Sequence, residues 1–329
     1  KEPSLSVSQK DDVWLWHCFG CRKGGTVIDF VRQKENLSVK EVYERLRTKI
    51  AWSPPASRND SVNGNGVHKP NPLELLKSVT DFYHQNFFED KRGVEYLKQR
   101  GIKSEETIRS FKVGFVTGQM RRNLSYSSPM IKDLKEVGIL NEEGNEFFYN
   151  SIVIPLLDED GNVVSLYGRN ITRKGHLYLK GPHRGLVNRQ GAFSTDKVIL
   201  TEAVLDALSL YELGIRNVIP CYGTGGFTED HKALLTRQSI KEVELCFDND
   251  DAGRRGAEDL AAKLGGFGIK CSSIKLPGGI KDANDFLLAG KTKEEFLALP
   301  RHEDRSFAAA SAAPQDDGVC EIQKEKGTL

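Results

Sequence analysis

The sequence has few long apolar runs, few clustered cysteines and almost no net charge. None of its 329 residues lies in a run approaching the roughly 18 uninterrupted apolar residues that a membrane-spanning helix needs. Lys1 to Ser4 does not begin like a signal peptide. We therefore expect a cytoplasmic protein without a membrane partner. Of six cysteines only Cys18 and Cys21 lie close together, which excludes a disulfide framework.

The charge is balanced overall but unevenly distributed. The net charge of +1 predicts by itself neither an acidic nor a basic partner. Residues 165–195 contain no acidic residue, and residues 91–122 contain nine basic residues against three acidic ones. Such segregation suits an enzyme that holds a polyanion beside a carboxylate cluster. A solvated helix face is the alternative, and charge alone favours it.

Composition and periodicity divide the first half of the chain. Residues 13–21 indicate a strand and a tight turn with two thiols, and helical spacing follows after Gly25. Residues 52–72 are rich in Pro, Gly, Asn and Ser, which predicts a flexible linker. Helical spacing over 73–101 predicts two helices, and residues 151–167 predict a β-hairpin.

Short apolar strands alternate with helices from Lys197 onward. The strands are expected at 198–200, 217–221, 243–247 and 269–276. This alternation predicts a parallel sheet covered by helices. Ligands of such sheets bind beyond the carboxyl ends of the strands. From about Pro300 the chain is rich in Ala, Ser and Asp, and we expect a tail there.

Acidic residues follow three of these strands. Glu202 comes directly after the first strand, Asp248 and Asp250 follow the third, and Asp282 and Asp285 follow the fourth. Helix capping would explain one or two of them, because Asp250 precedes a typical helix start. It does not readily explain Glu202, since paired anions repel unless a cation lies between them. Oxygen ligands favour Mg²⁺ or Mn²⁺, the usual ions of nucleotidyl transfer.

Several motifs follow one another in a specific order. They are Thr201-Glu202-Ala203, Asp206-Ala207-Leu208, Tyr222-Gly223-Thr224-Gly225-Gly226, Phe247-Asp248-Asn249-Asp250-Asp251-Ala252-Gly253 and Lys281-Asp282-Ala283-Asn284-Asp285. This series resembles the TOPRIM domain, the catalytic fold shared by bacterial DnaG-type primases and topoisomerases. Residues 17–21 and 24–30 are similar to the second half of the primase CHC2 zinc finger. The pairing of the two resemblances points to a primase.

The resemblance implies an α/β fold with a TOPRIM parallel-sheet catalytic domain, a mixed α+β basic subdomain and a partial zinc ribbon. The expected divisions are 1–51 for the ribbon and the following helix, 52–72 for the linker, 73–194 for the basic subdomain, 195–292 for the TOPRIM domain and 293–329 for a short helix and a disordered tail.

The resemblance also implies a site and a reaction. Glu202, Asp248 and Asp250 would be catalytic and, with Asp282, would hold Mg²⁺ or Mn²⁺. The family joins ribonucleoside triphosphates into a short RNA primer on a single-stranded DNA template, the 3′-hydroxyl attacking the α-phosphate of the next nucleotide. The basic stretch would grip template and triphosphate. A replicative helicase would bind through regions outside this sequence.

Two positions depart from the family pattern. Ala203 stands where the family usually has glycine, and Leu177 stands where a lysine commonly precedes the tyrosine. Contacts of Arg169, Lys180 and Arg184 with nucleotide or nucleic acid are therefore one hypothesis, and solvated loop charges are its equal.

The zinc site is half present in the sequence. Structural zinc needs four ligands, and Cys18 and Cys21 supply two. The other arm, a Cys-x-x-His in the family, would precede Lys1. Zinc is therefore expected if this sequence is a fragment, and a relic finger if Lys1 is the true start. Trp14 and Trp16 share one strand face and would stack on bases or pack in the core.

Two rival functions keep the same fold. A TOPRIM nuclease would use the same acids to hydrolyse phosphodiesters without needing ribonucleotides. A non-catalytic DNA-binding protein of a mobile element would retain the fold but need not preserve a working metal site.

Overall fold

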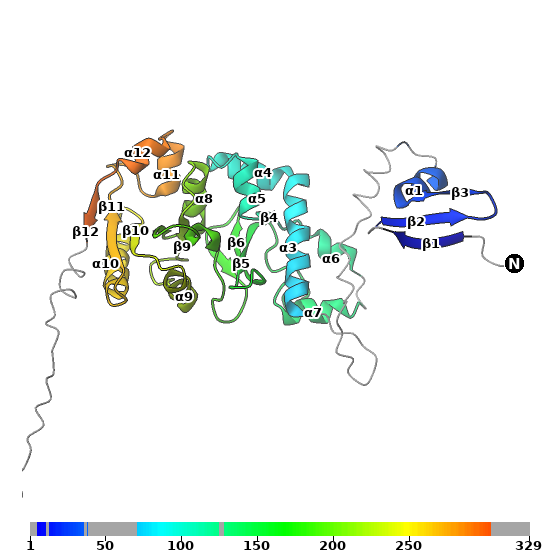
Figure 1. The fold of residues 1–329 in the computed structure, drawn as a ribbon, viewed down its shortest axis with the longest axis horizontal. Helices are drawn as coiled ribbons and strands as arrows, with labels where there is room; N and C mark the ends of the chain where they lie inside the picture. Colours follow the sequence, from blue (N-terminus) through cyan, green and yellow to red (C-terminus); the bar gives the residue numbers. More distant parts are fainter. Residues whose placement is uncertain (1–4, 11–12, 36–37, 39–70, 125–127, 304–329) are drawn as a thin grey trace, which may run out of the picture.

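The computed structural model describes residues 5–10, 13–35, 38, 71–124 and 128–303. These residues form three sheets with their helices (Figure 1). Of the predicted linker, only Asn71 and Pro72 fall within the described residues, and the predicted helix after Gly25 can be followed only to Glu35. No helix among the described residues is both long enough and apolar enough to cross a membrane.

The first sheet is a small antiparallel unit. It contains β1 (Leu5–Lys10), β2 (Val13–Cys18) and β3 (Lys23–Thr26), followed by α1 (Val27–Glu35). The indole Nε1 of Trp16 donates to the carbonyl of Thr26 over 3.1 Å, and its ring meets that of Phe30 edge-on. These contacts favour the packing role for Trp16. The side chain of Trp14 lies outside the described residues.

The second sheet and its helices form the middle of the chain. The elements are α3 (Pro72–Glu89), α4 (Lys91–Gln99), α5 (Glu105–Ser110), β4 (Gly114–Phe115), α6 (Gln119–Asn123), α7 (Met130–Glu136), β5 (Ser151–Leu157), β6 (Val163–Asn170), β7 (His176–Tyr178) and the 3₁₀ helix η1 (Arg189–Ala192). The sheet is antiparallel in the order β4-β5-β6-β7. The two predicted helices and the predicted hairpin are confirmed as α3, α4 and β5-β6.

Capping side chains fix the boundaries of the first two helices of this part. Asn71 accepts the N–H of Leu73 at the start of α3, where Pro72 needs no hydrogen-bond partner for a backbone N–H. Asp90 ends α3 and caps α4 by accepting the N–H of Arg92 over 2.9 Å. One short side chain thus separates two helices that share a continuous apolar pattern.

The third sheet is the predicted parallel sheet. Its elements are β8 (Lys197–Thr201), α8 (Val204–Glu212), β9 (Val218–Pro220), α9 (Glu229–Arg237), β10 (Glu242–Cys246), α10 (Asp251–Gly265), β11 (Lys270–Ile274), α11 (Ala283–Leu288), α12 (Lys293–Leu297) and β12 (Arg301–Glu303). The strand order is β12-β11-β10-β8-β9, and all pairs but β11-β12 are parallel. The chain moves from β8 to one neighbour, β9, and later to the other, β10, so the strand order reverses at β8.

Both faces of the parallel sheet are buried. Val198 and Leu200 of β8 pack with apolar residues of α9 and α10, whereas Ile199 between them packs with α8 and α11. Alternate side chains of a strand point to opposite faces, so both buried faces require apolar residues at the central positions 198–200 of β8. This explains why the strands read as short continuous apolar runs.

The end of the parallel sheet differs from the sequence prediction. Residues 301–303, which we expected in a tail, form β12 and pair antiparallel with β11. Arg301 fixes this strand because its Nε donates to the carboxylate of Glu244 over 3.0 Å and its Nη1 to the carbonyl of Leu297 over 2.8 Å. Three polar residues carry no strand pattern, so backbone pairing and one arginine decide the structure here.

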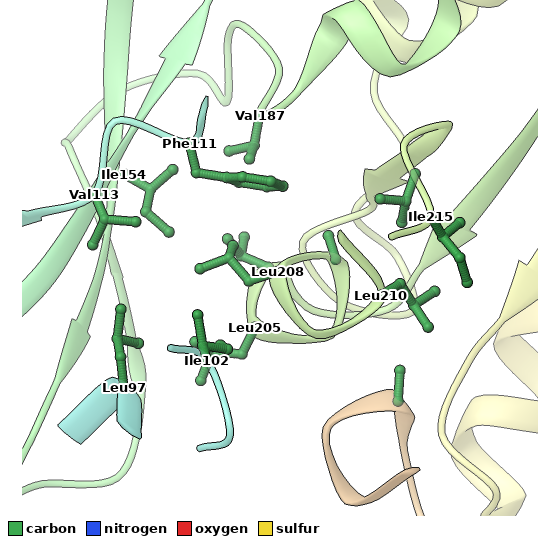
Figure 2. Close-up of a cluster of buried hydrophobic side chains, with 14 of the residues drawn as sticks. Leu97, Ile102, Phe111, Val113, Ile154, Val187, Leu205, Leu208, Leu210 and Ile215 are labelled. Atoms are coloured by element: carbon green, nitrogen blue, oxygen red, sulfur yellow. The ribbon is translucent and has the colours of Figure 1, made fainter. Parts of the chain in front are cut away.

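One hydrophobic core joins the second and third sheets. Figure 2 shows Phe111, Val113 and Ile154 of the middle part facing Leu205 and Leu208 of α8. All five side chains are 7% exposed or less. The middle part and the parallel sheet therefore pack as one body, which fixes the surfaces on either side of α8 relative to each other.

A buried polar connection reinforces this junction. Asn284 of α11 is 3% exposed, and its amide Nδ2 donates to the carbonyl of Arg100 over 2.7 Å and to the hydroxyl of Ser209 over 2.9 Å. Its Oδ1 accepts the guanidinium of Arg100, and its backbone N–H donates to Asp206. One asparagine thus ties α11 to α8 and to the end of α4.

We expect Asn284→Ala to lower the free energy of unfolding by about 2 kcal/mol, because it leaves the partners of a buried amide unsatisfied. Urea unfolding measures the change. Asn145→Ala is the matched control, since Asn145 is exposed and we expect its loss to have almost no effect. Equal stability of the two variants would contradict the structural role given to Asn284.

Candidate catalytic site

Strand pairing brings the two principal acids together. Cys246 of β10 lies opposite Thr201 of β8, so the residues that follow these strands leave the sheet at the same edge. The backbone N–H of Asp248 donates to Oε2 of Glu202 over 3.4 Å. Glu202 and Asp248 therefore lie close together, at the strand-order reversal where parallel sheets bind ligands.

Asp250 has two roles in this geometry. Its Oδ1 accepts the N–H groups of Ala252 and Gly253 over 3.1 and 2.9 Å, which caps α10 and lowers the pKa of its carboxyl. Capping also holds the loop between Asp248 and α10 tightly. A Cβ on Gly253 would lie 2.1 Å from the carbonyl oxygen of Asp248, so only glycine permits this approach.

Asp282 and Asp206 lie deeper beside the same edge. Asp282 caps α11 by accepting the N–H of Asp285 over 2.7 Å. Burial, and then the charges of Asp285 and Asp248, raise the pKa of Asp282. Asp206 is 5% exposed, and burial together with the charges of Asp282 and Asp248 raises its pKa well above the usual range. Capping thus accounts for Asp250 and Asp282 but for neither Glu202 nor Asp248.

Lys281, which was named above only as the first residue of a motif, contacts two of the acids. The ammonium of Lys281 lies 3.0 Å from Oδ2 of Asp248 and 3.7 Å from Oδ2 of Asp250. Bonding to Asp248 raises the pKa of Lys281, which keeps the ammonium charged. Lys281 lies on the connection from β11 to α11, outside any predicted helix or strand. The sequence pattern therefore did not indicate its role.

The electrostatics of the carboxylates fit a divalent cation. Burial, followed by the negative charge of Asp248, raises the pKa of Glu202, and Asp250 adds to the effect. A cation among these oxygens would relieve that repulsion. Among the described residues, no three His, Cys, Asp or Glu side chains already converge as a metal site. In this structure the ammonium of Lys281 pairs with Asp248 and Asp250.

The ribbon holds two candidate zinc ligands. Cys18 ends β2, and Cys21 lies exposed in the following turn. No third His, Cys, Asp or Glu joins them to form a metal-binding group in the part of the chain that the structure describes. Two thiolates are the right chemistry for zinc but only half of a tetrahedral set.

Two of the three predicted nucleotide-contacting cations line a pocket that does not include the candidate acids. Arg169 of β6 donates to the carbonyl of Gly175 over 3.3 Å, within its own hairpin. Lys180 and Arg184 line a pocket of about 420 Å³ beside α3 and α7. A different pocket, of about 480 Å³, includes Asp248 in its lining. The basic side chains of that pocket are Arg254, Lys275 and His302, which sequence reasoning missed.

Comparisons with known families cover most of the chain in three successive segments. Residues 1–61 match the CHC2 zinc finger, residues 82–192 match the DNA primase catalytic core, N-terminal domain, and residues 199–287 match the Toprim-like family. The Toprim-like segment contains every acid of the candidate catalytic site.

Curated relatives are DNA primases. The chain is 29% identical to the enzyme of Haemophilus influenzae, over 96% of this chain and 57% of the relative. It is 30% identical to that of Clostridium acetobutylicum, over 91% of this chain and 52% of the relative. The chain thus spans little more than half the length of these relatives.

Solved structures agree on the fold. A DnaG primase catalytic domain bound to single-stranded DNA superposes with a TM-score of 0.60 at 25% identity, covering 74% of this chain and 85% of that one. The zinc-binding and RNA polymerase domains of the Aquifex aeolicus primase give a TM-score of 0.59 at 23% identity, covering 92% of this chain and 80% of that one. The order of the three family matches, the relatives and the fold fit a bacterial DnaG-type primase with a CHC2 zinc finger, a DnaG catalytic core and a Toprim domain.

Proposed function

We propose that this chain is the priming part of a DNA primase: it joins ribonucleoside triphosphates into a short RNA on single-stranded DNA. The observation that carries the proposal is the approach of Glu202 to Asp248 at the strand-order reversal, with Asp250 on the same loop. The primase relatives favour this reaction over nuclease chemistry. Because such an enzyme works on replicating DNA, we also propose a cytoplasmic location.

In the mechanism, Glu202, Asp248 and Asp250 would hold the divalent cation, with Asp282 in support. When bound, Mg²⁺ or Mn²⁺ lowers the pKa of the attacking hydroxyl and neutralises charge at phosphate. The protein must keep the three carboxylates ionised and in place. The N–H groups of Ala252 and Gly253 do so for Asp250, since they stabilise its charged form.

Three basic residues are proposed to contact template or triphosphate. Lys180 and Arg184 share one pocket, and Arg169 lies on the neighbouring hairpin. Together with the other cations of residues 165–195 they would attract phosphate without reading sequence. A bound zinc ion would use Cys18 and Cys21 as two of its ligands, and a replicative helicase is a further proposed partner.

The direct test is incorporation of labelled ribonucleotides on single-stranded DNA with Mg²⁺ or Mn²⁺. We expect short RNA products that require template, because the template positions each incoming nucleotide. A parallel assay, in which the DNA carries the label and the ribonucleotides do not, reports on DNA cleavage. Shortened DNA without RNA would favour the TOPRIM nuclease, and binding without either product would favour the non-catalytic DNA-binding protein.

A further inference from the structure

The cation that meets the catalytic acids comes from the protein itself. Lys281 lies 3.0 Å from Asp248 and 3.7 Å from Asp250. No other lysine or arginine of the described residues forms an ion pair with either acid. Nearby Arg254 pairs with Asp251 instead. The ammonium therefore faces the carboxylates that are proposed to hold a metal.

The backbone around Lys281 is fixed by several hydrogen bonds. Its carbonyl accepts the N–H of Asn249, between the two acids, over 2.6 Å. The amide of Asn249 donates to the carbonyl of Ile280 over 3.3 Å, and the N–H of Lys281 donates to Asp285 over 3.3 Å. The loop after β11 is thus joined to the loop after β10, and the origin of the lysine side chain is held beside the acids.

The side chain, in contrast, is free to leave. Lys281 is 58% exposed, whereas its partner Asp248 is 20% exposed. An ion pair with so exposed a lysine contributes little, and four flexible methylenes let the ammonium swing into water. A displaceable cation requires a backbone that is fixed beside the acids and an ammonium group that is only weakly bound to them.

We propose that Lys281 is a displaceable counter-cation of the catalytic carboxylates: it neutralises Asp248 and Asp250 in the metal-free protein and moves away when a divalent cation binds. The proposal rests on one part of the proposed function, the binding of a divalent cation by these acids, and it holds equally for a primase and a nuclease. Lys281 is a positioning residue, because it keeps the mutually repelling acids together until the metal replaces it. The metal must compete with this ammonium, which lowers its apparent affinity.

The test measures Mn²⁺ binding by electron paramagnetic resonance, without nucleotide or DNA. Mn²⁺ prefers oxygen ligands, so Cys18 and Cys21 contribute little to the signal. We expect Lys281→Met to bind Mn²⁺ about three- to fivefold more tightly, the scale of an exposed ion pair. Lys281→Arg retains a cation and should not bind more tightly. Lys263→Met is the matched control, because this exposed lysine lies in the last turn of α10, at the opposite end of that helix from its cap Asp250.

A second measurement separates displacement from a merely structural ion pair. Without metal, Lys281→Met should melt below the unmodified protein, because the acids lose their counter-charge. Saturating Mn²⁺ should then raise its melting temperature by more than it raises that of the unmodified protein. Unchanged or weaker Mn²⁺ binding by Lys281→Met would overturn the proposal. So would Mn²⁺ binding that Glu202→Gln leaves intact, since the metal would then lie elsewhere, whatever the ribonucleotide assay gives.

Discussion

Asp248→Asn should lower ribonucleotide incorporation by about three orders of magnitude, the loss expected when several kcal/mol of charge stabilisation leave the transition state. The amide keeps the size of the side chain but not its negative charge. Glu202→Gln should have a similar effect, because the two carboxylates meet at the same edge of the sheet. Initial rates on a single-stranded template, at fixed Mg²⁺, measure both variants.

The fold should survive these substitutions. Asp248 caps no helix, and the pairing that it loses is with the exposed ammonium of Lys281. Relief of repulsion with Glu202 offsets that loss. Circular dichroism and the melting temperature should therefore stay close to those of the unmodified protein. Global unfolding of Asp248→Asn would mean that Asp248 is structural and that its loss of activity says nothing about catalysis.

Asp251→Asn is the matched control on the same loop. Asp251 is 79% exposed, and its carboxylate pairs with Arg254 rather than with Lys281. We expect its rate to fall by no more than about twofold, as for an exposed ion pair. If Asp251→Asn loses as much activity as Asp248→Asn, the loop as a whole is required, and the assignment to one carboxylate fails.

The positions of the acids could be predicted because parallel topology converts sequence order into spatial proximity. Short apolar runs at 198–200 and 243–247 were sufficient to indicate buried strands of a parallel sheet, whereas the structure shows that these two strands are adjacent. Once both strands run the same way, Glu202 and Asp248 must emerge at one edge. Capping by Asp250 was equally visible, because an acid before Ala252 and Gly253 is a local helix signal.

Lys281 and Arg301 could not be predicted in this way. Their partners lie 33 and 57 positions away along the chain, at Asp248 and Glu244, and are reached through loop geometry or edge-strand pairing rather than through periodicity. The same limit applies to Arg169, Lys180 and Arg184. Charge density marked their segment, but only the fold shows that Lys180 and Arg184 share a pocket that does not contain Asp248.

A buried histidine gives the second large effect, a loss of stability in mild acid. His231 of α9 is 1% exposed, and burial lowers its pKa to about 4. Its Nδ1 accepts the backbone N–H of Thr228 over 3.1 Å, and its Nε2 contacts the carbonyl of Pro220 over 2.9 Å. With Nδ1 accepting, the proton is on Nε2, and a second proton would break the capping box that starts α9.

The direction follows from the two protonation states. The unfolded histidine has a pKa of about 6.5, so between pH 6.5 and 4 the unfolded chain binds a proton that the folded protein excludes. Stability attributable to neutral His231 is complete above pH 6.5, falls progressively as the pH drops below 6.5, and is fully lost once the pH is below the folded pKa of about 4. The expected loss is about 3 kcal/mol over this window.

His231→Gln isolates this contribution. Glutamine at the same position can accept the N–H of Thr228 but does not titrate, so it should keep the capping box at every pH. The carboxyls of Glu146, Glu202, Asp206 and Asp282, whose pKa values are raised by burial, oppose the histidine by taking up protons in the folded state. These carboxyls act alike in both proteins, so the difference between the two unfolding curves reports His231 alone.

Urea unfolding at several pH values between 7 and 4 gives that difference. The stability of the unmodified protein relative to His231→Gln should fall by about 3 kcal/mol across the series. His302→Gln is the matched control, because His302 is exposed on β12 and its removal should leave the pH dependence unchanged. Parallel curves for the unmodified protein and His231→Gln would mean that α9 accepts a charged histidine. In that case the histidine would not control the stability of this face of the parallel sheet in acid.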